Sequence, residues 1–289
     1  MADWHDTNLA AIHSRLAWLR SEPEGTLHEE DSGLHHIRVV KHGGQVHLYF
    51  VEADGWLAGP MSRIDIDRPL HLLALYTQAA VLSLLWRPDP RRICVLGFGG
   101  GRLSLVLHHH LPGAIVDSVD IDPAFGPIAE RFFGVAYDAR QRLFVADARA
   151  FLESGADEQY DVLVMDAFRD SSDNLDHLAT LGFYRLCRRR MAPGGVLCVN
   201  LLRSDPRFDA KAAAIRESFR HVAALEQRRS LVLFGTDRAR LDQRLAARAA
   251  DLQRGHGFDF PFVERAAELR PYRGPSGAPG EHAVPLDDS

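Results

Sequence analysis

The stretch VLGFGGGRLSLVLHHH, which runs from Val95 to His110, decides the fold of this chain. It begins inside the apolar run Ile93–Leu96, which is typical of a short strand buried in a parallel sheet. Glycines follow at Gly97, Gly99 and Gly101, and then a helical pattern of leucines. Because glycines let a chain turn tightly and let a ligand approach the backbone, the stretch predicts a ligand-binding strand, turn and helix.

The glycine pattern alone does not identify the ligand. It reads G-x-G-x-G, and Arg102 stands where the dinucleotide fingerprint G-x-G-x-x-G has its third glycine. A turn that only packs a strand against a helix is the alternative. Asp120 favours a ligand, because it lies 23 residues after Gly97, near the spacing of about 20 residues at which a carboxylate binds ribose hydroxyls. We therefore predict an adenosine-type ligand.

Strand and helix patterns alternate through the rest of the chain. We predict helices at 70–86, 102–110, 124–134, 148–154, 178–191 and 238–254, and strands at 93–96, 114–122, 142–147, 160–168, 194–202, 221–227 and 229–235. The last two strands are close enough to form an antiparallel pair. Such a series predicts an α/β fold with a doubly wound, mostly parallel sheet of seven strands, which is Rossmann-like.

Three segments follow from the changes of pattern along the chain. Residues 1–68 read as a small β-rich unit, with a leading amphipathic helix at 6–21 and a hairpin between 34 and 51. Residues 69–272 form the predicted ligand-binding domain. The tail at 273–289 is rich in glycine and proline, so we expect it to be disordered.

Composition excludes several classes of protein. The 289 residues carry a net charge of −5, which provides no basic field for nucleic acid. The most apolar segment, 71–86, is too short and too polar to span a bilayer, and the N-terminus lacks the pattern of a signal peptide. We therefore expect a cytoplasmic protein that binds neither nucleic acid nor membrane.

No metal site is expected either. The three cysteines are far apart and form no C-x-x-C pair. The run His108–His110 resembles a metal cluster, but consecutive helical side chains point about 100° apart and do not converge on one ion. We interpret this run as the polar end of a helix.

Three successive predicted strands end in a carboxylate, at Asp120, Asp147 and Asp166. Parallel strands place these ends on one edge of the sheet, where a ligand crevice lies. Acids gathered there attract a sulfonium or an amine and repel a pyrophosphate. The alternative is that each aspartate is only a turn residue.

The combination resembles the spermidine synthase family, the polyamine aminopropyltransferases, within the class I S-adenosylmethionine-dependent fold. The resemblance runs from about Leu34 to about Phe234. It rests on VLGFGGG for the glycine loop, VDID with Asp120 and Ile121, VADAR with Asp147 and Ala148, and YDVLVMDAF with Asp166.

The resemblance implies transfer of an aminopropyl group from decarboxylated S-adenosylmethionine to a small-molecule amine such as putrescine. Asp166 would orient the amine and accept a proton from it. A primary amine has a pKa of about 10.4 if it resembles lysine, so it must lose a proton before it attacks. Tyr76 and Asp170 would contact the acceptor, and Asp120 and Asp147 would bind the ribose and the adenine edge. A homodimer is also implied.

Departures from the family pattern concern the acceptor. The family's second substrate acid falls on Arg169, with Asp170 one residue later, and its Tyr-x-Glu becomes Tyr76-Thr77-Gln78. We therefore expect a family member whose acceptor differs from putrescine. An S-adenosylmethionine-dependent methyltransferase and a non-catalytic binder of methylthioadenosine or polyamine stay open, and a nicotinamide oxidoreductase fits least.

Overall fold

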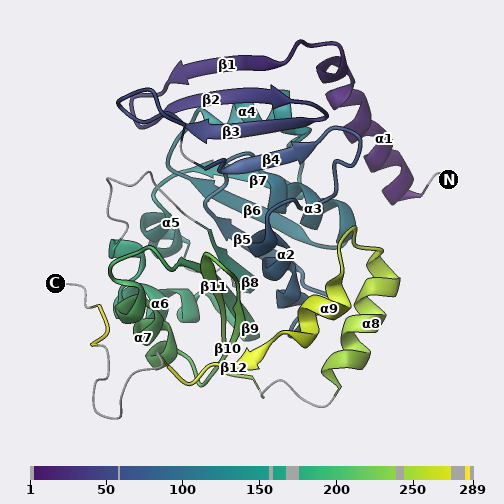
Figure 1. The fold of residues 1–289 in the computed structure, drawn as a ribbon. Helices are drawn as coiled ribbons and strands as arrows, with labels where there is room; N and C mark the ends of the chain where they lie inside the picture. Colours follow the sequence, from purple (N-terminus) through teal and green to yellow (C-terminus); the bar gives the residue numbers. More distant parts are fainter. Residues whose placement is uncertain are drawn as a thin grey trace.

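The computed structural model describes residues 3–57, 59–155, 159–166, 176–238, 244–274 and 284–286, and it contains two sheets (Figure 1). A four-stranded antiparallel sheet lies over one end of a larger, mostly parallel sheet. This arrangement confirms the predicted α/β class. It also places a separate β layer next to the carboxyl ends of the parallel strands.

The smaller sheet is a meander in the order β1-β2-β3-β4. Its strands are β1 Gly25–Asp31, β2 His36–His42, β3 Gln45–Phe50 and β4 Ser62–Asp65. The helix α1 Trp4–Leu16 and a 3₁₀ turn, Ala17–Arg20, precede it. The predicted leading helix and hairpin are confirmed, and Gly43 turns the hairpin at φ 58°. β1 and β4 were not predicted.

The larger sheet has the order β12-β10-β11-β9-β8-β5-β6-β7, in which β9 to β7 run parallel. The chain moves outward from β5 to β6 and β7, then returns to the other side of β5 with β8. A ligand crevice is expected at this switch point. The strands are β5 Arg92–Leu96, β6 Ile115–Asp120, β7 Gln141–Val145, β8 Tyr160–Met165, β9 Met191–Leu202, β10 His221–Glu226, β11 Ser230–Thr236 and β12 Arg270–Pro271. β10 and β11 pair antiparallel as predicted, and the two-residue β12 is one strand more than the seven expected.

Helices cover both faces of the larger sheet, so its central strands are buried on both sides. In β5, Ile93 and Val95 pack with α2, α3, α8 and α9, whereas Cys94 and Leu96 pack with α5, α6 and α7. The helices are α2 Leu75–Val81, α3 Arg102–His110, α4 Phe125–Phe133, α5 Ala148–Ser154, α6 Leu181–Arg189, α7 Phe208–Ser218, α8 Leu245–His256 and α9 Phe262–Ala267, with 3₁₀ turns Leu82–Leu85 and Asp176–Leu178.

A shared apolar core joins the two sheets. Val39 and Leu48 of the smaller sheet pack in one cluster with Phe98 after β5 and with Phe125 and Phe132 of α4. All five side chains are buried. The β-rich unit is therefore part of the structure that supports the crevice.

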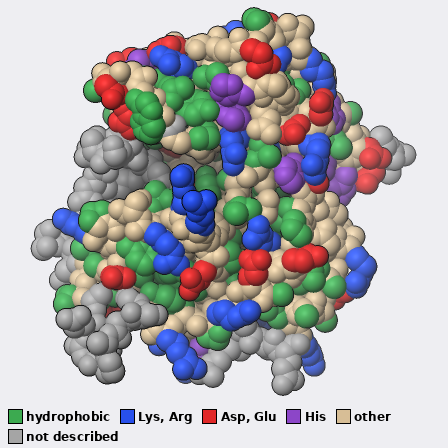
Figure 2. Space-filling model, in the orientation of Figure 1, with side chains coloured by type: hydrophobic (Ala, Val, Ile, Leu, Met, Phe, Trp, Pro, Cys, Tyr) green, Lys and Arg blue, Asp and Glu red, His purple; other side chains and the backbone are tan. Residues whose placement is uncertain are grey.

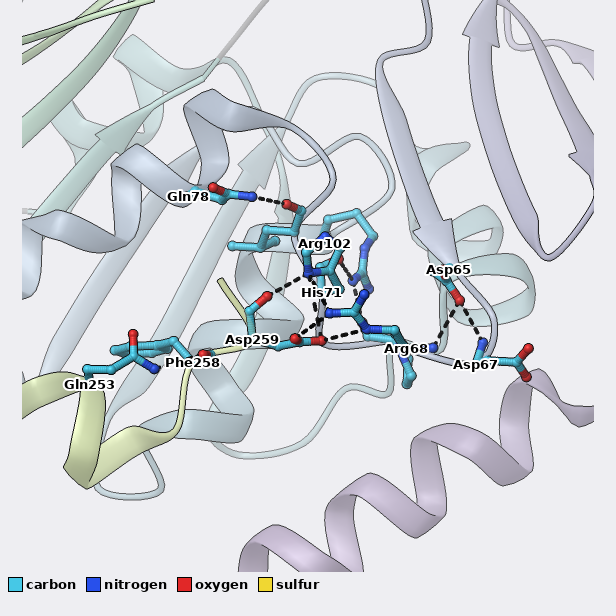
Figure 3. A network of polar contacts seen from close by, with 11 residues as sticks. Asp65, Asp67, Arg68, His71, Gln78, Arg102, Gln253, Phe258 and Asp259 are labelled. Carbon is cyan, nitrogen blue, oxygen red and sulfur yellow. Dashed lines mark hydrogen bonds and ion pairs between the residues drawn. The ribbon is translucent and has the colours of Figure 1, made fainter. Parts of the chain in front are cut away.

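A polar network strengthens the segment that connects the sheets (Figure 3). The buried guanidinium of Arg102 donates to the carbonyl oxygens of Pro69 and His71. Arg68 pairs with Asp259, in the loop between α8 and α9. The residue that interrupts the dinucleotide fingerprint thus holds the connecting segment against α3.

The histidine run is buried, so our interpretation of it as a polar helix end is wrong. His108, His109 and His110 are each no more than 4% exposed, because α1 and the α8–α9 segment cover the end of α3. Trp4 donates from Nε1 to the carbonyl of His109 at 3.0 Å, and the His110 ring lies 4.8 Å from that of Phe258. Burial lowers the pKa of His109 to about 4 and that of His110 to about 3. Both are therefore neutral core side chains at pH 7.

Neither a membrane span nor a metal cluster is found in the described residues. None of the helices described is long and apolar enough to cross a bilayer. Within the same residues, no three side chains of histidine, cysteine or acid are grouped to hold a metal ion.

Candidate active site

A cavity of about 950 Å³ lies between the smaller sheet and the carboxyl ends of β5, β6, β7 and β8. The structure brings Asp120, Asp147 and Asp166 together on its wall, as their positions at strand ends predict. Gly97, Gly99, Ile121, Ala148 and Tyr76 also line it. Of the other expected site residues, Gly101 is not in the lining, and Asp170 lies outside the described residues.

The glycine loop needs its glycines because their backbone conformation is unfavourable for other residues and because they let a ligand approach the backbone. Gly97, Gly99 and Gly101 have φ values of 94°, 51° and 65°, a region that other residues rarely adopt. A Cβ on Gly101 would also lie 2.6 Å from Cζ of Phe98. Gly97 and Gly99 therefore offer backbone to a ligand, whereas Gly101 serves packing beneath the loop.

Asp120 holds the glycine loop in place. Its Oδ2 accepts hydrogen bonds from the backbone N–H groups of Phe98 at 2.8 Å and Gly99 at 3.2 Å, and Oδ1 accepts one from Asp122 at 3.2 Å. Burial raises the pKa of Asp120, and the three hydrogen bonds offset part of that effect. The neighbouring Ile121 is 40% exposed, so it presents an apolar surface to the cavity.

Asp147 forms hydrogen bonds with the start of α5 and with a histidine. It caps α5, accepting a hydrogen bond from Ala150 N at 2.9 Å, and it lies 3.1 Å from Nε2 of His177. Burial raises its pKa, but these hydrogen bonds outweigh burial, so the pKa of Asp147 is lowered overall. Ala148 follows at the start of α5 and leaves room beside the carboxylate. Asp147 is therefore the acid of the three that stays ionised most readily.

Asp166 has a different environment at the end of β8. It accepts hydrogen bonds from the side chains of Asn200, on the adjacent strand β9, and of Tyr76, on α2. Its Oδ1 is buried and has no partner within the described residues. Burial raises the pKa of Asp166 to about 8, although the two hydrogen bonds lower it. This carboxyl group can therefore take up or release a proton near neutral pH.

Tyr76 stays a phenol under these conditions. Burial and the charge of Asp166 raise its pKa well above the usual value. Tyr76 is thus a hydrogen-bond donor that orients Asp166 and does not compete for its proton.

Sequence reasoning missed several residues of the site. Asn200 interrupts an otherwise apolar strand, a polar signal that the pattern does carry. Ser62 accepts a hydrogen bond from Gly100 N at 3.0 Å, and His177 reaches Asp147 from a separate turn. These two contacts depend on tertiary structure, so no local pattern indicates them.

Exposed apolar and basic residues line the outer part of the cavity. Trp56, Leu75 and Leu202 are apolar residues that line it while staying 66%, 46% and 39% exposed. Arg228 and Arg229, from the turn between β10 and β11, lie beside them. In the space-filling view, Lys and Arg side chains border the hollow below the smaller sheet (Figure 2).

Curated relatives match part of the chain, although no protein-family model matches it. The polyamine aminopropyltransferase of Vibrio vulnificus (strain CMCP6) is 30% identical over 146 residues, which cover 50% of this chain and 48% of that protein. That of Chromobacterium violaceum is 30% identical over 150 residues, covering 52% and 57%. The eEF1A lysine and N-terminal methyltransferase of Mus musculus is 31% identical over 161 residues, covering 48% and 22%. The chain thus spans about half the length of the aminopropyltransferases that it matches.

Solved structures match more of the chain. A probable spermidine synthase from Corynebacterium glutamicum ATCC 13032 has a TM-score of 0.68 at 22% identity, over 93% of this chain and 98% of that one. A spermidine synthase in complex with the transition state analogue AdoDATO has a TM-score of 0.61 at 16% identity, over 84% and 88%. Human methyltransferase-like protein 13 in complex with SAH has a TM-score of 0.56 at 22% identity, over 73% and 98%. The curated relatives are transferases by name, and the chain has the fold of these spermidine synthase and methyltransferase structures.

Proposed function

We propose that the protein transfers an aminopropyl group from decarboxylated S-adenosylmethionine to an amine acceptor. The observation that carries the proposal is Asp166, a carboxyl group on a large cavity with one buried oxygen that has no partner among the described residues. Its pKa of about 8 suits exchange of a proton with an amine. The names of the aminopropyltransferase relatives support the same reaction.

The adenosyl part of the co-substrate would occupy the side of the cavity near β6 and β7. Asp120 would bind the ribose, with the adenine between Ile121 and Ala148 and its edge at Asp147. Gly97 and Gly99 would face the tail that bears the sulfonium. A positively charged sulfur is favoured there, because the ionised carboxylate of Asp147 lines the same cavity.

Transfer then needs one bond to form and one to break. The amine nitrogen attacks the propyl carbon next to the sulfonium, and the electrons of the carbon–sulfur bond move to sulfur, which leaves as neutral methylthioadenosine. The nitrogen gives its surplus proton to the ionised form of Asp166, whose hydrogen bonds from Tyr76 and Asn200 fix the carboxyl group. The protein contributes orientation and proton transfer.

Product analysis tests the proposal directly. We would incubate the protein with decarboxylated S-adenosylmethionine or S-adenosylmethionine, each with a panel of primary amines, and quantify the released nucleoside. We expect methylthioadenosine from the decarboxylated compound, and none when the amine is omitted. Release of S-adenosylhomocysteine alone, from S-adenosylmethionine, would show that the protein is a methyltransferase instead.

A further inference from the structure

Two adjacent arginines occupy a well-fixed turn at the outer part of the cavity. Arg228 and Arg229 connect β10 to β11, and both are exposed and line the cavity. The turn is closed by a hydrogen bond from Gln227 N to Ser230 O at 3.0 Å. Arg203 N also donates to Arg229 O at 2.9 Å, which ties the turn to the end of β9. The two cations are thus presented from a defined backbone.

No acid neutralises these two arginines in the part of the chain that the structure describes. Arg203, at the end of β9, pairs with Glu226 at 2.9 Å. Arg228 and Arg229 form no such pair with any described residue. An unpaired double cation on a substrate cavity favours a negatively charged group.

The inner part of the same cavity has the opposite polarity. Oδ1 of Asp166 and Oδ1 of Asn200 are buried acceptors without partners among the described residues, whereas Nε2 of Gln227, near the arginines, is a buried donor without one. Two unpartnered acceptors therefore lie at the end of β8 and on β9, and an unpartnered donor lies at the β10–β11 turn. Buried polar atoms normally have partners, so a bound molecule is expected to supply them.

The register of the sheet gives the separation of the two ends. Asn200 and Leu202 lie on one face of β9 and both line the cavity, and Leu202 is opposite Ser230. Arg229 bonds to Arg203, three residues beyond Asn200. At about 3.3 Å per residue the backbone positions are roughly 10 Å apart, a distance that flexible arginine side chains can shorten.

From this polarity we propose that the acceptor is a primary amine carrying a carboxylate at its far end, rather than a diamine. This inference rests on the proposed function and names its substrate class. The amine donates to Asp166 and Asn200, and the carboxylate accepts hydrogen bonds from Arg228, Arg229 and Gln227. A diamine would instead place its second cation against two arginines.

A matched set of amines tests the inference through binding. The probes are 1,4-diaminobutane, 4-aminobutan-1-ol and 4-aminobutanoate, with the corresponding six-carbon set, each titrated calorimetrically into the protein in the presence and absence of methylthioadenosine. We expect the aminocarboxylate to bind roughly tenfold more tightly than the diamine of the same length, with the alcohol between them. The preference should weaken as salt is added.

Charge-reversal variants complete the test. In the double variant Arg228→Glu with Arg229→Glu the order should reverse, and in the double glutamine variant the preference should disappear without reversing. Arg203→Gln, which removes the nearby arginine that is paired with Glu226, should leave the order unchanged. Unaltered circular dichroism of the variants checks that the exposed turn has not disturbed the fold.

The inference and the proposed function fail in different ways. A diamine that binds more tightly than the aminocarboxylate to the unaltered protein, or an order that survives charge reversal, overturns the inference. If the aminocarboxylate is preferred but no amine releases methylthioadenosine, aminopropyl transfer is wrong and the cavity is a binding site for aminocarboxylates. If only diamines release methylthioadenosine, aminopropyl transfer stands and the inference is wrong.

Discussion

Asp120 and Asp166 end two strands on either side of β5, yet the protein surrounds them differently. Both are partly buried and both have raised pKa values. Asp120 accepts hydrogen bonds from three backbone N–H groups and fixes a loop. Asp166 is held by two side chains, and its Oδ1 has no partner in the part of the chain that the structure describes. The strand end determines where a carboxylate lies, and the donors around it determine its role.

The largest expected effect is on the chemical step at Asp166. Asp166→Asn removes the proton acceptor but keeps the shape, so the rate of nucleoside release should fall by roughly 10²–10⁴-fold. Methylthioadenosine should bind as before, because its expected contacts lie elsewhere. Single-turnover kinetics and calorimetry measure the two quantities separately. A variant that keeps its rate would show that Asp166 is not the base.

Asp120→Asn should act on binding and stability. The amide replaces an acceptor oxygen with an N–H₂ group that faces the donors of Phe98 and Gly99, so the glycine loop loses a charged partner. We expect a loss of about 2 kcal/mol in the free energy of unfolding and roughly thirtyfold weaker nucleoside binding. Denaturant titration and calorimetry check both. Equal loss of nucleoside binding in Asp120→Asn and Asp166→Asn would remove the distinction between the two strand ends.

The last expected effect is the pH dependence of stability that Asp166 causes. Burial moves the pKa of Asp166 from 3.8 to about 8, so between these values the folded protein holds a proton that the unfolded chain has lost. The stability contributed by this proton is complete below pH 4 and is lost as the pH rises toward 8. Asp166→Asn should therefore melt higher than the unaltered protein at pH 8, by roughly 2–4 °C for each kcal/mol. A stability difference that does not grow between pH 5 and pH 8 would contradict the raised pKa.

Much of the fold could be predicted from the sequence because the parallel strands are short, apolar and bounded by glycine or an acid. The run Ile93–Leu96 and the aspartates at the ends of β6, β7 and β8 predict one edge of the cavity from sequence alone. At these residues the local sequence pattern and the place of the strand in the sheet indicate the same structure. The expected homodimer and the cytoplasmic location stay predictions.

The rest depends on tertiary contacts that local patterns do not contain. β1 is charged along GTLHEED and pairs only because β2 is beside it. The run His108–His110 is polar by composition, yet α1 and Phe258 bury it. The positive charge at the outer part of the cavity comes from Arg228 and Arg229, which line it from a hairpin turn that reads as an ordinary charged loop.

The core shared by the smaller sheet and the glycine loop links the stability of the pocket to that of both sheets. Phe98, next to the expected ribose position, packs among side chains of both sheets. A shortened protein lacking the first 68 residues would lose the roof of the pocket and also the packing that shapes its floor. Ligand binding should therefore raise the melting temperature of one cooperative transition that includes both sheets.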